Sequence, residues 1–197
     1  MAREPVDRRE HIIASSAKLF ARNGVAATTV RQIADEVGIL SGSLYHHFDS
    51  KEAIVDEVVS SFLNDLRARY EKILTSDQDA RTRLHDLVVT SLEVVEAHPH
   101  ATEIYQNDVN YLSQLSRFAY LRKAGRDVQN AWLRVIQAGI AEGVFRSDID
   151  PKILYRLMRD SVWMSVRWFK PTKEYTRAQL ATDCTSIFLD GLAKPSA

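Results

Sequence analysis

A short segment near the N-terminus carries residues whose size and polarity suit contact with nucleic acid. Ser41, Gly42 and Ser43 have very small side chains, which let the backbone of a helix approach a DNA groove closely. Thr29 and Lys51 stand where flanking helices are expected to begin, and helix N-termini and ammonium groups both attract phosphate. Arg31 is either a further DNA contact or only a solvated residue.

A second candidate site lies on a helix expected between residues 151 and 169. At about 100° per residue, its cations fall within one arc around Trp163, opposite a wide apolar face. These cations are Lys152, Arg156, Arg159, Arg167 and Lys170. The arc predicts an anionic, partly apolar ligand, because guanidinium groups bind phosphate or carboxylate and the tryptophan can stack. The alternative is a solvated charged face whose arginine stems shield the tryptophan.

Eleven of the seventeen aromatic residues lie between Tyr105 and Tyr175. Such side chains would line a ligand pocket in a helical body, but an aromatic-rich core explains them equally well. The candidate ligand-binding residues are Tyr105, Tyr111, Phe118, Trp132, Arg159, Trp163 and Arg167.

The histidines and the single cysteine form no metal-binding or catalytic pattern. His46 and His47 are neighbours, which on a helix would point about 100° apart, and no further ligand follows four residues later. Cys184 is the only thiol, and no Gly-x-Ser-x-Gly nucleophile elbow is present. We therefore expect no catalytic residues, no metal, no cofactor and no enzyme activity.

Apolar residues recur with helical spacing through most of the chain, and no Asn-Gly or Asp-Gly hairpin signal is present. We predict an all-α fold of about nine helices, with a three-helix helix-turn-helix head at residues 1–52 and a larger helical ligand-binding and dimerisation body at residues 53–197. Thr29 and Gln32 have capping-box spacing, and Gly38 suits the turn between the two short helices. The predicted helices cover residues 6–22, 30–37, 41–47, 50–74, 80–97, 101–112, 114–142, 151–169 and 176–192.

The charge balance bears on both candidate sites. The chain has 197 residues with 26 basic and 26 acidic side chains, so a whole-molecule electrostatic hold on nucleic acid or membrane is excluded. Residues 1–52 carry seven of each sign, whereas residues 101–197 carry fourteen basic and ten acidic side chains. DNA binding by the head must then depend on a few placed contacts. No signal-peptide pattern and no run of about 18 apolar residues is present, which favours a cytoplasmic protein with no membrane partner.

The string from Thr29 to Ile54, TVRQIADEVGILSGSLYHHFDSKEAI, closely resembles the DNA-binding signature of the TetR family of bacterial repressors. The resemblance implies that Tyr45, His46 and His47 contact phosphate or base edges. It also implies a homodimer whose two heads bind an inverted repeat in double-stranded operator DNA. Where the family commonly has Ser or Thr after the turn this chain has Leu40, so Ser41 is left as the alternative helix cap.

Two further segments, EGVFR at residues 142–146 and YRLMRDSVWMSVRWFKP at residues 155–171, resemble TetR-family repressors of steroid-ring (cholesterol) catabolism in actinobacteria. The resemblance implies release from the operator by a coenzyme A thioester of a partly degraded steroid. An anionic nucleotide joined to an apolar bicycle matches the arc of cations around a tryptophan. The dimer face, which family inference places on the last two helices, consists of Leu157, Met164, Trp168, Ile187, Phe188 and Leu192.

Three other functions stay open at this point. One is a TetR-type regulator of lipid or efflux genes with another acyl-CoA or hydrophobic effector, although the basic arc disfavours a neutral ligand. Another is an enzyme acting on such a thioester, which the absence of a nucleophile elbow disfavours. The last is a helical scaffold without DNA function, which the specificity of the head motif disfavours.

Overall fold

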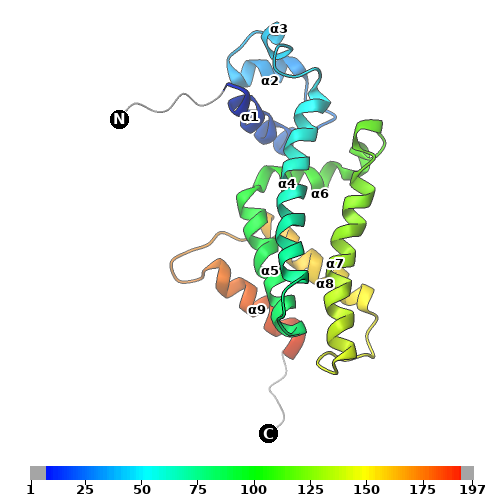
Figure 1. Ribbon diagram of the computed structural model, residues 1–197. Coiled ribbons are helices and arrows are strands. Elements are labelled where there is room, and N and C mark those ends of the chain that lie inside the picture. The colour runs from blue at the N-terminus through cyan, green and yellow to red at the C-terminus, as the bar shows by residue number, and fades with distance from the viewer. Residues whose placement is uncertain (1–7, 192–197) are drawn as a thin grey trace. The chain divides into compact units, whose positions relative to one another are not determined.

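The computed structural model describes residues 8–191, which form nine α-helices, two short 3-10 helices and no strand. The predicted all-α fold class is therefore confirmed. The chain divides into two compact units, Met1–Asn64 with His98–Lys123 and Asp65–Ala97 with Ala124–Ala197 (Figure 1). The predicted boundary between residues 52 and 53 falls in the first turn of α4 (Lys51–Leu74), which continues from the first unit into the second.

The first unit contains the three-helix head. Its α1 packs against both α2 and α6, and α2 packs against α3 (Figure 1). Large side chains that are fully buried, such as Phe20, Ile33 and Phe62, form its core. Its elements are α1 (Arg8–Asn23), α2 (Val30–Val37), α3 (Ser41–Leu44), the first part of α4, α6 (Pro99–Leu112) and the 3-10 helix η1 (Ser116–Phe118).

The second unit is a helical bundle in which α5 packs against α8 and α9, and α8 also packs against α9 (Figure 1). Fully buried side chains of α5 and α7, including Leu84, Leu87 and Trp132, contribute to its core. Its elements are the rest of α4, α5 (Ala80–Ala97), most of α7 (Leu121–Ala141), α8 (Pro151–Trp163), the 3-10 helix η2 (Met164–Arg167) and α9 (Arg177–Asp190).

Two helices, 30–37 and 80–97, have the bounds that the sequence predicts. The expected helix at 151–169 instead ends at Trp163, and η2 follows it. The hydroxyl of Ser165 donates to the carbonyl of Val162 at 2.5 Å, and such local side-chain bonds compete with helical ones. The expected helix at 114–142 is likewise divided into η1 and α7. In the described part of the chain no helix is long and apolar enough to cross a membrane.

Candidate nucleic-acid interface

The start of α2 and the turn after it have the geometry of a helix-turn-helix. The backbone N–H of Gln32 donates to the Thr29 hydroxyl at 3.2 Å, and the Thr29 N–H donates to the Gln32 side-chain oxygen at 2.8 Å. These two bonds form the predicted capping box. Gly38 has φ 74°, a left-handed conformation that favours glycine, and its N–H donates back to α2. The chain thus leaves α2 and enters α3 within a few residues.

The apolar residues expected to hold α2 and α3 together are all buried; they are Ile33, Ala34, Val37, Leu44 and Phe48. None of the candidates for DNA contact is buried. The exposed candidates are Thr29, Arg31, Gly42, Tyr45, His46 and His47, and the half-buried ones are Ser41, Ser43 and Lys51. The buried face of the two helices is therefore the one that the sequence predicts.

The segment after α3 differs from the expected helix at 41–47. Only Ser41–Leu44 is α-helical, and Tyr45, His46 and His47 lie in the turn that follows. The N–H of His47 donates to the Leu44 carbonyl at 3.0 Å, three residues back, as in a tightening turn. At the other end of α3, Leu40 occupies the N-cap position with no side-chain cap bond. Helical spacing therefore does not describe the directions of the two histidines.

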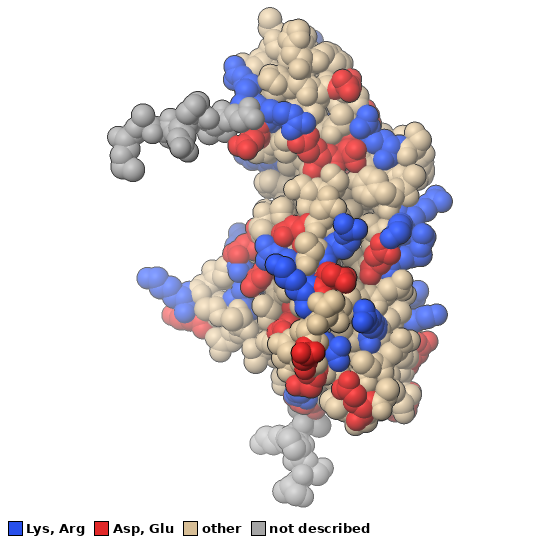
Figure 2. All heavy atoms as spheres, in the orientation of Figure 1, with Lys and Arg blue, Asp and Glu red and all other residues tan. Residues whose placement is uncertain are grey.

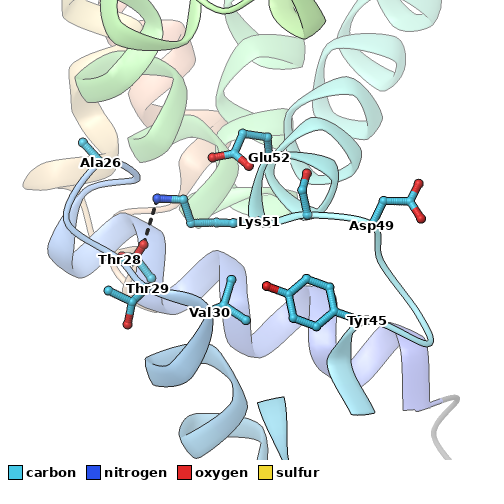
Figure 3. A pocket seen from close by; sticks show the side chains of 9 residues that line it. Ala26, Thr28, Thr29, Val30, Tyr45, Asp49, Lys51 and Glu52 are labelled. Carbon is cyan, nitrogen blue, oxygen red and sulfur yellow. Dashed lines mark hydrogen bonds between the residues drawn. The ribbon is translucent and has the colours of Figure 1, made fainter. Parts of the chain in front are cut away.

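Lys51 reaches from the start of α4 to the loop between α1 and α2. Its ammonium group donates to the carbonyl oxygens of Val25 and Thr28, both at 2.8 Å. Figure 3 shows Lys51 and Glu52 along one side of a hollow of about 340 Å³, with Val30 and Tyr45 opposite. The Lys51 ammonium group therefore binds the loop between α1 and α2, and the sequence did not predict this contact.

No strongly basic field accompanies this surface. Figure 2 shows that the end of the first unit that carries α3 is mostly uncharged on the visible face. Arg31 is exposed, and its nearest acidic partner is Asp35 at 4.0 Å, one helical turn away. Among residues 8–191 no group of three or more His, Cys, Asp or Glu side chains could hold a metal ion. The local geometry therefore suits placed hydrogen-bond and apolar contacts rather than a general attraction to phosphate.

One candidate ligand residue of the second unit, Trp132, belongs to a buried network of hydrogen bonds. The indole N–H of Trp132 donates to the Tyr70 hydroxyl at 2.9 Å, and that hydroxyl lies 2.6 Å from the Ser91 hydroxyl. Ser91 donates to the Leu87 carbonyl at 2.6 Å, so Tyr70 must be the donor to Ser91. Burial raises the pKa of Tyr70 well above its usual range, so its hydroxyl stays protonated.

Aromatic rings connect this network of hydrogen bonds to α8. The ring of Trp132 lies 6.3 Å from that of Tyr155, and the Arg159 guanidinium lies over the Tyr155 ring at 5.6 Å. Arg159 Nε also donates to the Asp160 carboxylate at 2.8 Å. One candidate cation is therefore already paired with an acid and with an aromatic face.

The predicted arc of five cations around Trp163 is wrong in its geometry. Because α8 ends at Trp163, Arg167 lies in the 3-10 helix and Lys170 lies beyond it, where a count of about 100° per residue does not apply. Trp163 is only 8% exposed, so its ring is packed inside the unit rather than at the centre of a charged face. Lys152 and Arg156 remain exposed on α8.

The other candidate ligand residues belong to the first unit. Phe118 is fully buried in η1, and its ring lies 6.4 Å from that of Tyr120. Tyr105 on α6 is half-buried, with its ring 5.9 Å from that of Phe62, and Tyr111 is half-buried on the same helix. Phe118 and Tyr105 therefore have packing roles in the first unit.

Part of the predicted dimer face is an exposed apolar surface in the single chain. Leu157 and Trp168 are 57% and 61% exposed, and Met164 and Ile187 are also exposed. Phe188 is half-buried, and Leu192 lies outside the described residues. Large apolar side chains in water on α8, η2 and α9 are typical of a surface that another molecule covers.

Comparison with known proteins decides the family. Residues 12–58 match the model of bacterial regulatory proteins of the tetR family, and residues 77–192 match that of the tetracyclin repressor-like C-terminal domain. The chain belongs to the TetR family. It is 47% identical over 188 residues to the HTH-type transcriptional repressor KstR2 of Rhodococcus jostii, covering 95% of this chain and 92% of that protein.

Two solved structures support the fold. The structure of the ketosteroid transcriptional regulator KstR2 of Mycobacterium tuberculosis matches with a TM-score of 0.88 and 41% identity, covering 97% of each chain. AibR, crystallised in complex with isovaleryl coenzyme A and operator DNA, matches with a TM-score of 0.79 at 17% identity, covering 93% of this chain and 98% of that one. The chain is thus a DNA-binding transcriptional repressor, and its relatives are regulators rather than enzymes.

Two contacts tie the head to α4 and α6 within the first unit, and the sequence did not predict them. Arg9 lies with its guanidinium 4.7 Å from the Phe48 ring centroid and forms an ion pair with Glu57. Asp108 on α6 accepts the backbone N–H of Val25 at 3.4 Å, and burial raises the pKa of Asp108. Its partner is 83 residues away in sequence. No local pattern in the sequence signals a contact over that separation.

Proposed function

We propose that this chain is a homodimeric repressor of steroid-ring (cholesterol) catabolism genes, released from its operator by a coenzyme A thioester of a partly degraded steroid. The observation that carries the proposal is the identity of 47% to a KstR2 repressor along 95% of the chain. The name ketosteroid regulator belongs to the similar protein of M. tuberculosis. Since operators are chromosomal DNA, the repressor would act in the cytoplasm.

The chemistry of the second unit supports an effector with an anionic part and an apolar part. The Arg159 guanidinium lies over the ring of Tyr155, and that ring lies beside the ring of Trp132. A phosphate or carboxylate would compete with Asp160 for that guanidinium, and an apolar ring system would pack against the aromatic side chains. AibR offers a precedent within the fold, since it was crystallised with a coenzyme A ester and operator DNA.

The exposed apolar face supports a dimer. We propose that Leu157, Met164, Trp168 and Ile187 pack against the same residues of a second copy, together with Phe188 and Leu192. Two heads then bind successive major grooves about 34–36 Å apart, and an effector that changes this spacing weakens DNA binding. A coupling of about 1–3 kcal/mol gives a switch of roughly 5- to 150-fold.

The first experiment measures operator release. The full-length protein is titrated by fluorescence anisotropy against DNA from upstream of steroid-ring genes, with and without the thioester of a two-ring steroid fragment. We expect tight binding that the thioester weakens at least about fivefold, whereas free coenzyme A and the free steroid acid have little effect. Unchanged DNA affinity at saturating thioester would rule out this effector.

Two variants test the role of α8. Arg159→Gln should leave DNA binding intact and abolish release by the thioester, while Asp160→Asn should tighten thioester binding because it removes the competing carboxylate. Arg134→Gln, which removes an exposed cation from α7, is the matched control. If Arg159→Gln responds to the thioester as the unmodified protein does, the cations of α8 form only a solvated face.

The same titrations separate the second candidate function. A regulator of lipid or efflux genes would respond to isovaleryl coenzyme A or a longer fatty acyl thioester rather than to the steroid thioester. The likeness to AibR in fold keeps this candidate open. Release by fatty acyl thioesters alone would assign the chain to that class of regulators.

A further inference from the structure

Leu40 is an apolar side chain in an unusual place. It stands at the N-cap of α3, with φ −72° and ψ 144°, and is 80% exposed. In the described part of the first unit, Leu40 and Tyr45 are the only large apolar residues that are exposed. Leu40 lies at the N-terminal end of α3 and Tyr45 at its C-terminal end. The helix that we expect to face DNA therefore has an exposed apolar or aromatic side chain at each end.

The side chain of Leu40 does not cap α3, although Leu40 occupies the N-cap position. Its carbonyl accepts the N–H of Ser43 at 2.9 Å, which any residue could do, but its side chain makes no cap bond. Ser, Thr, Asp or Asn would satisfy an exposed backbone N–H of α3 at this position. A residue that breaks a local rule while remaining exposed is best explained by contact with a partner.

The other side chains of α3 are short or buried, so they offer a partner little contact. Ser41, Gly42 and Ser43 are short, and Leu44 is buried against the head. Leu40 therefore extends further from the backbone than any of the three small residues that follow it. Tyr45 instead lines the hollow beside Lys51 (Figure 3), and it carries a hydroxyl that can bind phosphate.

We propose that Leu40 contacts the 5-methyl group of a thymine in each operator half-site and makes that base pair a determinant of specificity. In the major groove, the thymine methyl is the apolar feature that base edges present. The uncharged surface around α3 in Figure 2 suits such a contact better than a contact with phosphate. The proposal rests on DNA binding by this head, which the family membership establishes.

The test removes one methyl group at a time. A preferred duplex is selected from random DNA with the full-length protein, and each thymidine of one half-site is replaced by deoxyuridine, which lacks only the 5-methyl group. We expect one position at which deoxyuridine weakens binding about fourfold, since burying one such carbon contributes roughly 0.8 kcal/mol. The other positions should change affinity much less.

Variants at position 40 assign the effect to the leucine. Leu40→Ala removes the contact in both half-sites of the dimer, so it should weaken binding to the thymidine duplex by about fifteenfold, and it should show no further loss with deoxyuridine at the sensitive position. Leu40→Met, which keeps an apolar side chain, should retain the thymidine preference. Leu40→Ser should lose that preference while raising the melting temperature, because it restores a cap; this readout also shows that the variant folds.

The outcomes separate the Leu40 proposal from DNA binding itself. If no duplex is enriched, the head does not bind DNA specifically and the repressor function fails with it. If a duplex is enriched but deoxyuridine has no effect at any position, the methyl contact is refuted alone. Equal deoxyuridine effects in the unmodified protein and in Leu40→Ala would assign the methyl contact to another residue.

Discussion

Replacing Lys51 with methionine tests whether this side chain stabilises the head. The ammonium group donates to the carbonyls of Val25 and Thr28 at 2.8 Å each, and both of these residues are buried. Methionine keeps most of the apolar stem and removes both bonds. The two carbonyls lie in the loop that leads from α1 into the capping box of α2, so the loss acts on the positioning of the DNA-binding helices.

The magnitude follows from the number and kind of the bonds. Hydrogen bonds to charged groups contribute about 1.5–3 kcal/mol each, and Lys51 is only half-buried, so water replaces part of this contribution. We expect Lys51→Met to lower the free energy of unfolding by about 2 kcal/mol in total. For a chain of this length, that loss lowers the melting temperature by roughly 4–8 °C.

Urea denaturation of the full-length protein, followed by circular dichroism, measures the change. Lys18→Met, which removes an exposed cation of α1, is the matched control and should change stability by less than about 0.5 kcal/mol. An unfolding free energy for Lys51→Met equal to that of the control would refute the stabilising role.

The salt dependence of DNA binding tests separately whether Lys51 contacts phosphate, because losing one phosphate contact lowers the slope of log affinity against log salt by about one. An ammonium group has three N–H donors, so one remains for phosphate after two bind carbonyls.

Three further predictions concern stability and DNA approach. Tyr70→Phe leaves the buried indole N–H of Trp132 without its acceptor and should lower the unfolding free energy by about 1–3 kcal/mol in urea titrations; a change below about 0.5 kcal/mol would contradict the importance of this hydrogen bond. Gly42→Ala adds a Cβ that meets nothing within 4 Å, so the melting temperature should hold or rise while operator affinity falls. Equal operator affinity would show that α3 does not approach DNA closely there. Because burial raises the pKa of Asp108, the folded state holds that proton more tightly than the unfolded chain, and stability falls as pH rises through the window between the two values. Asp108→Asn should therefore flatten the stability profile at pH values just above about 3.9, the usual pKa of an aspartate, and a slope equal to that of the unmodified protein would exclude this group as its source.

The sequence was sufficient for features that depend on neighbours within one or two helical turns. The capping box at Thr29, the left-handed Gly38 and the inner face of the head arise from contacts three to five residues apart, so spacing and residue type predict them. The family follows in the same way, because its signature is a continuous string. Leu40 as a residue without cap function was also visible in the sequence, although its exposure was not.

Only the tertiary structure decided which distant groups meet. Lys51 binds carbonyls 23 and 26 residues away, and Trp132 donates to a hydroxyl 62 residues away. These pairings depend on how whole helices pack, which no local periodicity encodes. The end of α8 is a related case, since its apolar pattern continues past Trp163 while the backbone tightens into a 3-10 helix and moves Arg167 off the predicted arc. The sequence alone therefore determined the fold class and the family and predicted a face for DNA contact, whereas packing decided which cations are paired within the fold and which remain exposed.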